Sequence, residues 1–399
     1  MSVVLPVLAM GCAAVAGTGC VQAMLGAGLL ARFRRAERRP TPLVQPPPVT
    51  VLKPLYGAEP LLEEALESFC TQDYPQMQIL FGVREADDAA VAIVRRLQHR
   101  HPRLDMQLVV DPTLHGINRK ISNLMNVMPH VKHDILVISD SDIHVGPDYL
   151  RHIVTALNTP GTGLVTTLYA GLPALPTLVQ ALAACQINHN FLPGVILSRY
   201  LGRQDCLGAT MALRRTALDA VGGLEALVDH VADDALLGRL IRQQGLNITI
   251  AECMTWTTIA ESGFGDLMHH ELRWGRTVCA LAPAGYAASS IQLPLFWATL
   301  AVLFQVHAAW TLPFFWAVWG VRAVTALIID RAVGSRPLWP VLLLPLRDWL
   351  SAAIMLGSAS GTEVHWRGQT MHVGPHPTAP PAVPGAFSAS QQGTATPPP

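Results

Sequence analysis

The chain has 399 residues, of which half are hydrophobic and 14% are charged, and its mean hydropathy is +0.32. This composition is richer in apolar side chains than a soluble domain requires, so it indicates a membrane protein. The formal net charge is zero, and the seven cysteines form no CxxC pair or Cys/His cluster, which argues against a nucleic-acid-binding protein, a zinc site and a disulfide framework.

The first apolar stretch, residues 1–31, contains no charged residue and is long enough to cross a bilayer about 30 Å thick. A cleaved signal peptide would carry positive charge before its apolar core, whereas here five arginines follow it in residues 32–39. We therefore predict a transmembrane helix whose arginines stay in the cytoplasm. Residues 40–48 hold five prolines, so residues 32–48 are expected to form a basic, Pro-rich linker.

The middle of the chain alternates short apolar runs with longer amphipathic ones. Alternating strands and helices favour a mainly parallel α/β sheet, which we place in one cytoplasmic domain, residues 49–280. The expected strands are residues 49–52, 78–83, 107–110 and 135–138, and the expected helices between the first three are residues 60–70 and 89–99.

After residue 280 the composition turns apolar again, so residues 281–360 are expected to hold an interfacial segment and two or three transmembrane helices. The candidate spans are residues 291–309, 312–329 and 338–356. Arg347 and Asp348 interrupt the last of them, which leaves the number of spans open. Residues 361–399 form a C-terminal segment, whose part from residue 373 onward has a composition typical of disorder.

Two carboxylates follow the most apolar of the expected strands. Asp140 and Asp142 come directly after residues 135–139, and the end of a parallel strand lies at the carboxyl edge of the sheet, where open α/β folds bind ligands. Carboxylate oxygens suit Mg²⁺ or Mn²⁺, whose coordination diphosphate oxygens and water can complete. The pattern predicts a metal-bound nucleotide diphosphate, and the alternative is a solvated turn or a helix N-cap.

A second acidic loop follows the strand at residues 78–83. It contains Glu85, Asp87 and Asp88, and it opens at the same edge of the predicted sheet. Carboxylates there could accept hydrogen bonds from a uracil ring or from ribose hydroxyls, which makes Glu85 and Asp88 candidate donor-binding residues. N-capping of the next helix by Asp87 is an equally physical account of that residue.

The third acidic pair, Asp233-Asp234, starts a predicted helix. Alone, it is explained by the helix dipole, which stabilises negative charge at a helix N-terminus. A later segment, residues 270–274 (HELRW), brings Arg273 and Trp274 onto a helix with His270, where they could hold a diphosphate and a sugar over the metal.

The set of Asp88, Asp140, Asp234 and Arg273-Trp274 resembles the D, D, D, (Q/R)xxRW signature of the inverting family-2 glycosyltransferase superfamily, from which His270 departs at the Q/R position. Longer segments resemble the ceramide glucosyltransferase family, family 21. These segments are residues 51–57 (VLKPLYG), 72–75 (QDYP), 116–125 (GINRKISNLM) and 364–368 (VHWRG). Residues 140–143 (DSDI), 193–195 (PGV) and 270–276 (HELRWGR) look closest to the bacterial branch associated with hopanoid biosynthesis.

The resemblance implies a nucleotide-diphospho-sugar transferase (GT-A type) fold flanked by transmembrane helices. It implies that Asp88 helps to bind the nucleotide, that Asp140 and Asp142 face the metal and diphosphate, and that Asp234 is the general base. Lys53 and Lys120 lie in matched segments and could contact donor phosphates, although a surface lysine near a turn is an alternative. His189 falls where the acceptor region is expected, although it could equally be a core or surface histidine.

The resemblance further implies an inverting enzyme that moves N-acetylglucosamine from UDP-N-acetylglucosamine to bacteriohopanetetrol in a bacterial inner membrane. A domain held against the bilayer by helices at both ends favours such a lipid acceptor. A ceramide glucosyltransferase that uses UDP-glucose is the alternative. A processive polysaccharide synthase usually needs more membrane helices, and neither a metal-dependent phosphohydrolase nor an inactive membrane scaffold accounts for Arg273 and Trp274 together with Asp234.

Overall fold

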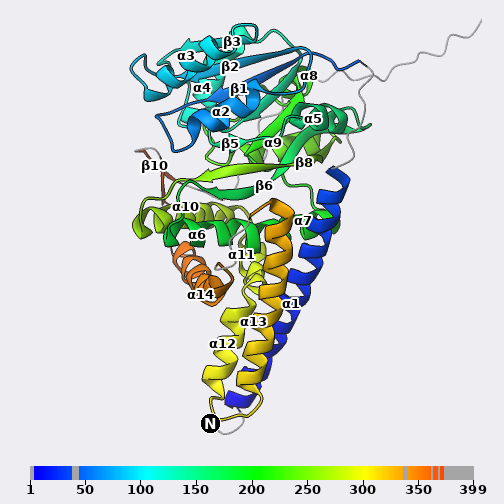
Figure 1. Ribbon diagram of the computed structural model, residues 1–399, viewed down its shortest axis with the longest axis vertical. Helices are drawn as coiled ribbons and strands as arrows, with labels where there is room; N and C mark the ends of the chain where they lie inside the picture. Colours follow the sequence, from blue (N-terminus) through cyan, green and yellow to red (C-terminus); the bar gives the residue numbers. More distant parts are fainter. Residues whose placement is uncertain (1–3, 38–44, 336–339, 361–362, 367–368, 373–399) are drawn as a thin grey trace, which may run out of the picture.

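The computed structural model describes residues 4–37, 45–335, 340–360, 363–366 and 369–372, and it places an α/β domain on a helical stalk (Figure 1). An eight-stranded sheet in the order β3-β2-β1-β4-β7-β6-β8-β5 forms the centre of the domain. Its strands are β1 (Val49–Pro54), β2 (Met77–Val83), β3 (Asp105–Val110), β4 (Ile135–Ser139), β5 (Ile143–His144), β6 (Thr162–Pro173), β7 (Thr210–Arg214) and β8 (Asn247–Ile259).

The half of the sheet formed by β3, β2, β1 and β4 is parallel, as the sequence predicts. Side chains alternate between its two faces, because successive residues of a strand point in opposite directions. In β4, Ile135 and Val137 enter one core cluster, whereas Leu136 and Ile138 enter the other. A strand that is buried on both faces must be apolar throughout, which explains the unbroken run that predicted it.

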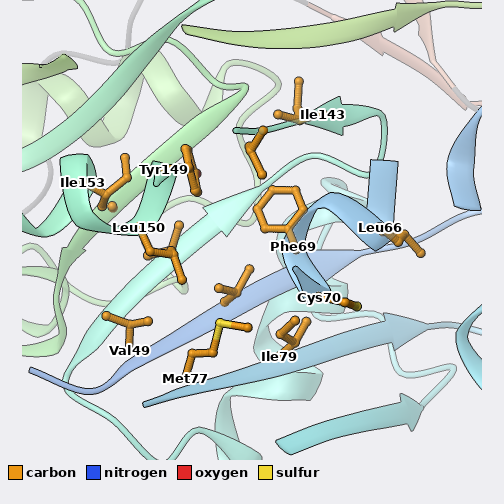
Figure 2. Packing of buried hydrophobic residues seen from close by; sticks show 14 of the residues in the cluster. Val49, Leu66, Phe69, Cys70, Met77, Ile79, Ile143, Tyr149, Leu150 and Ile153 are labelled. Carbon is orange, nitrogen blue, oxygen red and sulfur yellow. The ribbon is translucent and has the colours of Figure 1, made fainter. Parts of the chain in front are cut away.

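Helices cover both faces of this parallel half. The first face carries α2 (Leu62–Cys70), α3 (Ala89–Arg100) and α5 (Tyr149–Leu157), and the second carries α4 (Arg119–Val127), which η1 (Met128–His130) follows, α8 (Arg215–Ala220) and α9 (Asp233–Gln243). On the first face the rings of Phe69 and Tyr149 meet edge to face, with centroids 5.6 Å apart (Figure 2). Such aromatic pairs add to the stabilisation from burial alone.

The other half of the sheet makes the fold mixed rather than mainly parallel. β7 runs antiparallel to both β4 and β6, and β5 runs antiparallel to β8, whereas β6 and β8 are parallel to each other. The α/β class expected from the sequence is therefore confirmed, with an antiparallel extension that the sequence analysis did not predict.

A layer of helices separates the sheet from the stalk (Figure 1). It consists of α6 (Leu178–Cys185), the π-helix η2 (Gln186–Phe191), α7 (Leu192–Tyr200) and α10 (Phe264–Leu281), with α11 (Pro283–Ala288) and η3 (Ser289–Gln292) leading downward. A hairpin of β9 (Glu363–Trp366) and β10 (Gln369–His372) lies near α10. The expected disordered tail from residue 373 lies outside the described residues.

The stalk contains α1 (Val4–Glu37), α12 (Pro294–Phe304) and α13 (Thr311–Val333), and α14 (Pro340–Ser358) lies beside it under α6 and α10 (Figure 1). Among the described residues, α1, α13 and α14 are long and apolar enough to cross a membrane. Residues 283–304 would add a fourth span only as a pair of segments bent by 74°, so the expected continuous span at residues 291–309 is broken.

The first helix does not end where the apolar stretch ends. It continues through Arg32, Arg34 and Arg35 to Glu37, so the first part of the expected linker is helical. Arg34 donates a hydrogen bond to the carbonyl oxygen of Ala332 at 2.7 Å, which ties the upper ends of α1 and α13 together.

Close packing of α1 against α7 depends on a glycine. A Cβ at Gly26 would lie 2.5 Å from Cβ and 2.7 Å from the carbonyl oxygen of Pro193, whereas a Cβ at Gly28 would meet nothing within 4 Å. Gly26→Ala should therefore destabilise the protein by about 1–3 kcal/mol through overpacking. Gly28→Ala is the matched control and should be within about 0.5 kcal/mol of the parent.

Thermal unfolding of both variants in detergent, followed by tryptophan fluorescence, measures the difference. Equal midpoints for Gly26→Ala and Gly28→Ala would show that α1 does not pack on α7 as described.

Candidate active site

The loop after β4 carries Asp140, Ser141 and Asp142 and turns directly into β5. Hydrogen bonds fix it on both sides, because Asp140 N donates to Ala209 O at 3.3 Å and Thr258 N donates to Asp142 O at 3.0 Å. The hydroxyl of Thr257 also donates to Asp142 Oδ2. The two carboxylates are thus held at the carboxyl edge of β4, as the sequence predicts.

Lys120 links this loop to the start of α9. Its Nζ lies 2.6 Å from Asp140 Oδ1 and 3.7 Å from Asp233 Oδ2, and its side chain is only 11% exposed. Burial lowers the pKa of Lys120, but the negative charges of Asp140 and Asp233 outweigh burial and raise it above its ordinary value. Lys120 therefore carries its charge and is not the surface lysine of the alternative interpretation.

Asp233 and Asp234 form the first turn of α9, where the sequence placed them. Asp233 is buried and accepts a 3.3 Å hydrogen bond from Asn118 Nδ2, while its Oδ2 has no hydrogen-bond partner. Asp234 is half-buried beside Gly208, where a Cβ would lie 2.9 Å from Asp234 Oδ2. Burial first, and then the charge of Asp233, raise the pKa of Asp234 above its ordinary value.

Carboxylates outnumber cations in this region. Glu59 joins the loop by accepting a 2.9 Å hydrogen bond from Ser141 Oγ, and burial followed by the charge of Asp140 raises the pKa of Asp142 to about 6. The excess of oxygen donors, together with Asp233 Oδ2, which accepts no hydrogen bond, fits a divalent cation chemically. No group of three or more His, Cys, Asp and Glu side chains in the described ranges is arranged to hold a metal alone, so other oxygens would have to complete its coordination.

Lys53 lies beneath the loop and not at its surface. Its Nζ donates to Ser139 Oγ at 3.3 Å and to the main-chain oxygen of Asp140, and it lies 4.0 Å from the centroid of the Phe69 ring. Burial lowers the pKa of Lys53 to about 7 in spite of the neighbouring carboxylates. This position supports the loop from below and leaves no exposed surface for a donor phosphate.

Asp88 caps α3 and anchors the loop after β1. It accepts a 2.8 Å hydrogen bond from Ala90 N, and both of its carboxylate oxygens lie 3.0 Å from Gly57 N. The N-cap is therefore Asp88 and not Asp87, which the sequence analysis considered for that role. Glu85 is exposed, and its carbonyl oxygen accepts from Asp88 N at 3.2 Å.

The predicted residues of α10 form a second group. The ring of His270 meets Trp274 edge to face at 4.6 Å between centroids, and His270 Nδ1 pairs with Glu261 Oε1. Trp274 packs on an apolar cluster that includes Leu182 and Ile187, and Arg273 is half-buried.

Tyr169 of β6 lies between the two groups. Its ring is 5.2 Å from that of Phe191 and packs on the same apolar cluster as Trp274. Burial first, and then the charges of Asp234, Asp140 and Asp142, raise the pKa of Tyr169. Sequence reasoning missed Tyr169 and Glu59, because a single tyrosine in a strand or a glutamate in a loop carries no spacing signal.

His189 lies in η2, at the junction with the stalk. It is buried, and its Nε2 is 2.8 Å from Asp330 Oδ1 of α13. Burial lowers the pKa of His189, but the hydrogen bonds and negative charges of Asp330 and Cys185 together outweigh burial and raise it to about 9. The residue predicted for the acceptor region is thus a buried partner of a stalk helix.

The model of the family "Glycosyl transferase family 21" matches residues 11–379. Ceramide glucosyltransferase 1 of Caenorhabditis elegans is 24% identical over 205 residues, which are 51% of this chain and 44% of that protein. Ceramide glucosyltransferase 3 of the same organism is 26% identical over 243 residues, which are 59% and 52% of the two chains. The chain thus spans about half the length of these curated relatives.

Among solved structures, the mannosyltransferase PcManGT from Pyrobaculum calidifontis, in complex with GDP-Man and Mn²⁺, is similar with 22% identity and a TM-score of 0.49. The likeness covers 89% of this chain and 97% of that one. The family match, together with the mixed α/β sheet, confirms the predicted GT-A type of fold.

Lys120 bridges Asp140 and Asp233, so its replacement should leave the repulsion among the carboxylates uncompensated. Lys120→Met should lower the free energy of unfolding by about 2 kcal/mol at neutral pH, less than for a fully buried pair because Asp140 is partly exposed. The loss should shrink as the pH falls toward about 5, because Asp234, whose pKa is raised to about 6, becomes protonated and its charge no longer has to be balanced by the lysine.

The control is Lys132→Met, which breaks an exposed 2.6 Å pair with Asp105 and should cost less than about 1 kcal/mol at any pH. Denaturant unfolding at several pH values compares the two variants, and a pH-independent loss for Lys120→Met would contradict the electrostatic account.

Proposed function

This chain belongs to glycosyl transferase family 21, and we propose that it is an inverting glycosyltransferase that moves a sugar from a UDP-sugar to the hydroxyl of a membrane lipid. The observation that carries the proposal is the cluster of Asp140, Asp233 and Asp234 around Lys120, with Asp142 in the same loop as Asp140, at the sheet edge expected for a nucleotide diphosphate. A cluster with this excess of negative charge favours a bound cation and a donor whose phosphates bind through it.

Asp234 is the proposed general base. In an inverting displacement the acceptor oxygen bonds to the anomeric carbon, the bond from that carbon to the diphosphate breaks, and a carboxylate takes the hydroxyl proton, so an α-linked donor gives a β-linked product. The raised pKa of Asp234 suits this role, because a stronger base accepts the proton more readily while it still ionises near neutral pH. Asp140 would then receive the diphosphate side of the donor, next to Lys120.

Asp140 and Asp142 are the proposed ligands of Mg²⁺ or Mn²⁺. A bound divalent cation would stabilise the negative charge that develops on the departing nucleoside diphosphate. Thr257 and Lys53 orient the loop that carries the two carboxylates, and Arg273 is proposed to add positive charge beside the donor, with Trp274 and His270 shaping the sugar side.

Asp88 and Glu85 keep their proposed place on the nucleoside side of the site. The hydrogen bonds from Gly57 N to Asp88 support this role indirectly, since they anchor the loop that leads to Glu59. His189 remains a proposed acceptor-side residue, and its burial against Asp330 supports a role in shaping that region from below.

For the substrates, we propose UDP-N-acetylglucosamine as donor and bacteriohopanetetrol as acceptor, on the strength of residues 140–143, 193–195 and 270–276. The names of the relatives favour UDP-glucose and ceramide as the second candidate pair. In both cases the acceptor is a lipid with a hydroxyl group.

We also propose that the protein is a multi-pass protein of a bacterial inner membrane, with residues 49–280 in the cytoplasm. The candidate spans in α1, α13 and α14 and the arginines at the domain end of α1 support this placement.

The direct test is release of UDP by the purified full-length protein in lipid nanodiscs. We expect turnover with Mn²⁺ or Mg²⁺ when a UDP-sugar and a lipid acceptor are both present, and mass spectrometry of the product separates the two donor–acceptor pairs. Turnover that survives EDTA would contradict the metal site, and phosphate release without any acceptor would indicate a hydrolase.

Replacement of the proposed base separates binding from chemistry. Asp234→Asn should fold and bind UDP, yet its kcat should fall by about 10²–10⁴-fold, because an amide cannot accept the proton. Asp219→Asn on α8, outside the acidic cluster, is the matched control and should keep parental activity. Parental kcat in Asp234→Asn would remove the base assignment.

A further inference from the structure

A buried ion pair joins α10 to the candidate membrane helix α14. Arg347 Nη1 and Nη2 each lie 2.7 Å from one carboxylate oxygen of Glu271, so the pair is bidentate. The side chains are 0% and 9% exposed. Arg347 also donates to Leu182 O at 3.3 Å and to Ser351 Oγ at 3.1 Å, which leaves the guanidinium well satisfied.

The next residue of α14, Asp348, connects this helix to the stalk. Asp348 Oδ2 accepts a 2.9 Å hydrogen bond from Leu295 N at the start of α12, and Asp348 Oδ1 lies 3.4 Å from Arg322 of α13. Consecutive residues thus hold α14 to two parts of the molecule, because Arg347 binds the helical layer under the sheet and Asp348 binds the stalk.

The contact between α10 and the end of α14 is also sterically tight. Gly275 faces Ser358 and Tyr286 so closely that a Cβ there would overlap the Ser358 hydroxyl, and a Cβ at Gly357 would lie 3.1 Å from Leu272. The ion pair therefore lies within a packed helix–helix interface and fixes α10 together with that interface.

We propose that Glu271 is a positioning residue, which Arg347 holds so that α10 presents Arg273 and Trp274 in the orientation that sugar transfer requires. The inference rests on the proposed function, in which these two residues adjoin the donor. A forked pair fixes two points on a side chain and so restrains the rotation of the helix that carries it.

Helix geometry shows why this rotation matters. Successive residues turn by about 100°, so Arg273 lies about 200° from Glu271, on the side of α10 turned away from α14. Trp274, about 60° from Glu271 in the other sense, packs on the cluster of Leu182 and Ile187. A rotation of α10 would displace Arg273 and Trp274 together.

A contribution to stability does not by itself explain why the buried ion pair of Glu271 and Arg347 is present. Desolvation offsets much of the attraction in a buried ion pair, and well-packed apolar residues often replace such a pair without loss of stability. Burial first raises the pKa of Glu271, which reflects that desolvation, although the charge of Arg347 opposes it. The best-attested use of a buried pair is to specify one arrangement of its elements.

The test replaces the whole pair with apolar residues. The double variant Glu271→Leu with Arg347→Met should fold with a thermal midpoint close to that of the parent, because no buried charge is left unpaired. Its kcat for UDP release in nanodiscs should nevertheless fall by about 10–100-fold, since small misplacements of groups at the reacting centre are costly. Its Kd for UDP should change by less than about threefold, because Arg273 acts mainly on charge that develops during transfer.

The matched control is the other buried pair of α14. Asp348→Asn removes the charge of Asp348 from that pair and leaves Glu271, Arg347 and the bonds of Arg322 to His189 and Asn190 in place, so it should keep parental kcat. Parental kcat in the Glu271→Leu, Arg347→Met variant would overturn the proposal and reduce the pair to a structural contact.

Single conservative variants decide the question if the double variant does not fold. Arg347→Lys keeps the charge but not the fork, so its kcat should fall by about threefold or more, whereas Asp348→Asn should not change kcat. Equal kcat in these two variants would overturn the proposal. If the parent itself releases no UDP with either donor and either acceptor, the proposed function fails, and that result is distinct from failure of the positioning role.

Discussion

Repulsion among closely spaced, partly buried carboxylates is the constraint around which this molecule is organised. The loop after β4 contributes Asp140 and Asp142, and the first turn of α9, far away in the sequence, contributes Asp233 and Asp234. Lys120 lies within reach of both segments. Burial weakens the stabilisation of each charge by water, which raises the pKa of Asp142 and of Asp234. A site built in this way is stabilised by any cation that enters it, so the same feature that limits stability favours the proposed bound cation, through which the phosphates of the proposed donor would bind.

In the candidate membrane helices, buried charged side chains likewise have polar partners. Arg322, Asp330, Arg347 and Asp348 all lie in helices that are apolar enough to span a membrane, yet each is buried in the protein and bonded to another polar group. Their partners belong to η2, α10 and α12. Charges in lipid would be costly, so these interactions fix which faces of α13 and α14 point inward, and they join the stalk to the helical layer beneath the sheet.

The sequence predicted the parallel half of the sheet well because its signals are local. An apolar run such as Ile135–Ser139, followed by acidic residues, reports burial and the strand end directly. The antiparallel half escaped prediction because long strands such as β6 mix polar and apolar residues, and their pairing depends on distant segments. Hydropathy likewise predicted one span at residues 291–309, but it does not detect the 74° bend before Pro294.

At the site, the sequence located the carboxylates but not their environment. The identity of the N-cap, Asp88 instead of Asp87, depends on which backbone N–H groups come within reach, and the burial of Lys53 under the loop depends on β1 lying beside β4. Tyr169 became visible only in three dimensions, where it lies between the acidic cluster and the apolar cluster of Phe191 and Trp274.

That apolar cluster gives the proposed lipid acceptor a physical context. It also includes Leu343 and Leu350 of α14, so side chains in contact run from the membrane helix through Trp274 and Tyr169 toward the carboxylates. In the proposed reaction an acceptor hydroxyl would come within hydrogen-bond distance of Asp234, which would remove its proton, while the apolar part of the lipid would remain in the bilayer. Because Arg347 holds α14 to α10, this candidate membrane helix is tied to the helix that carries Arg273, and the proposed reaction would therefore depend on how the chain is seated in a membrane.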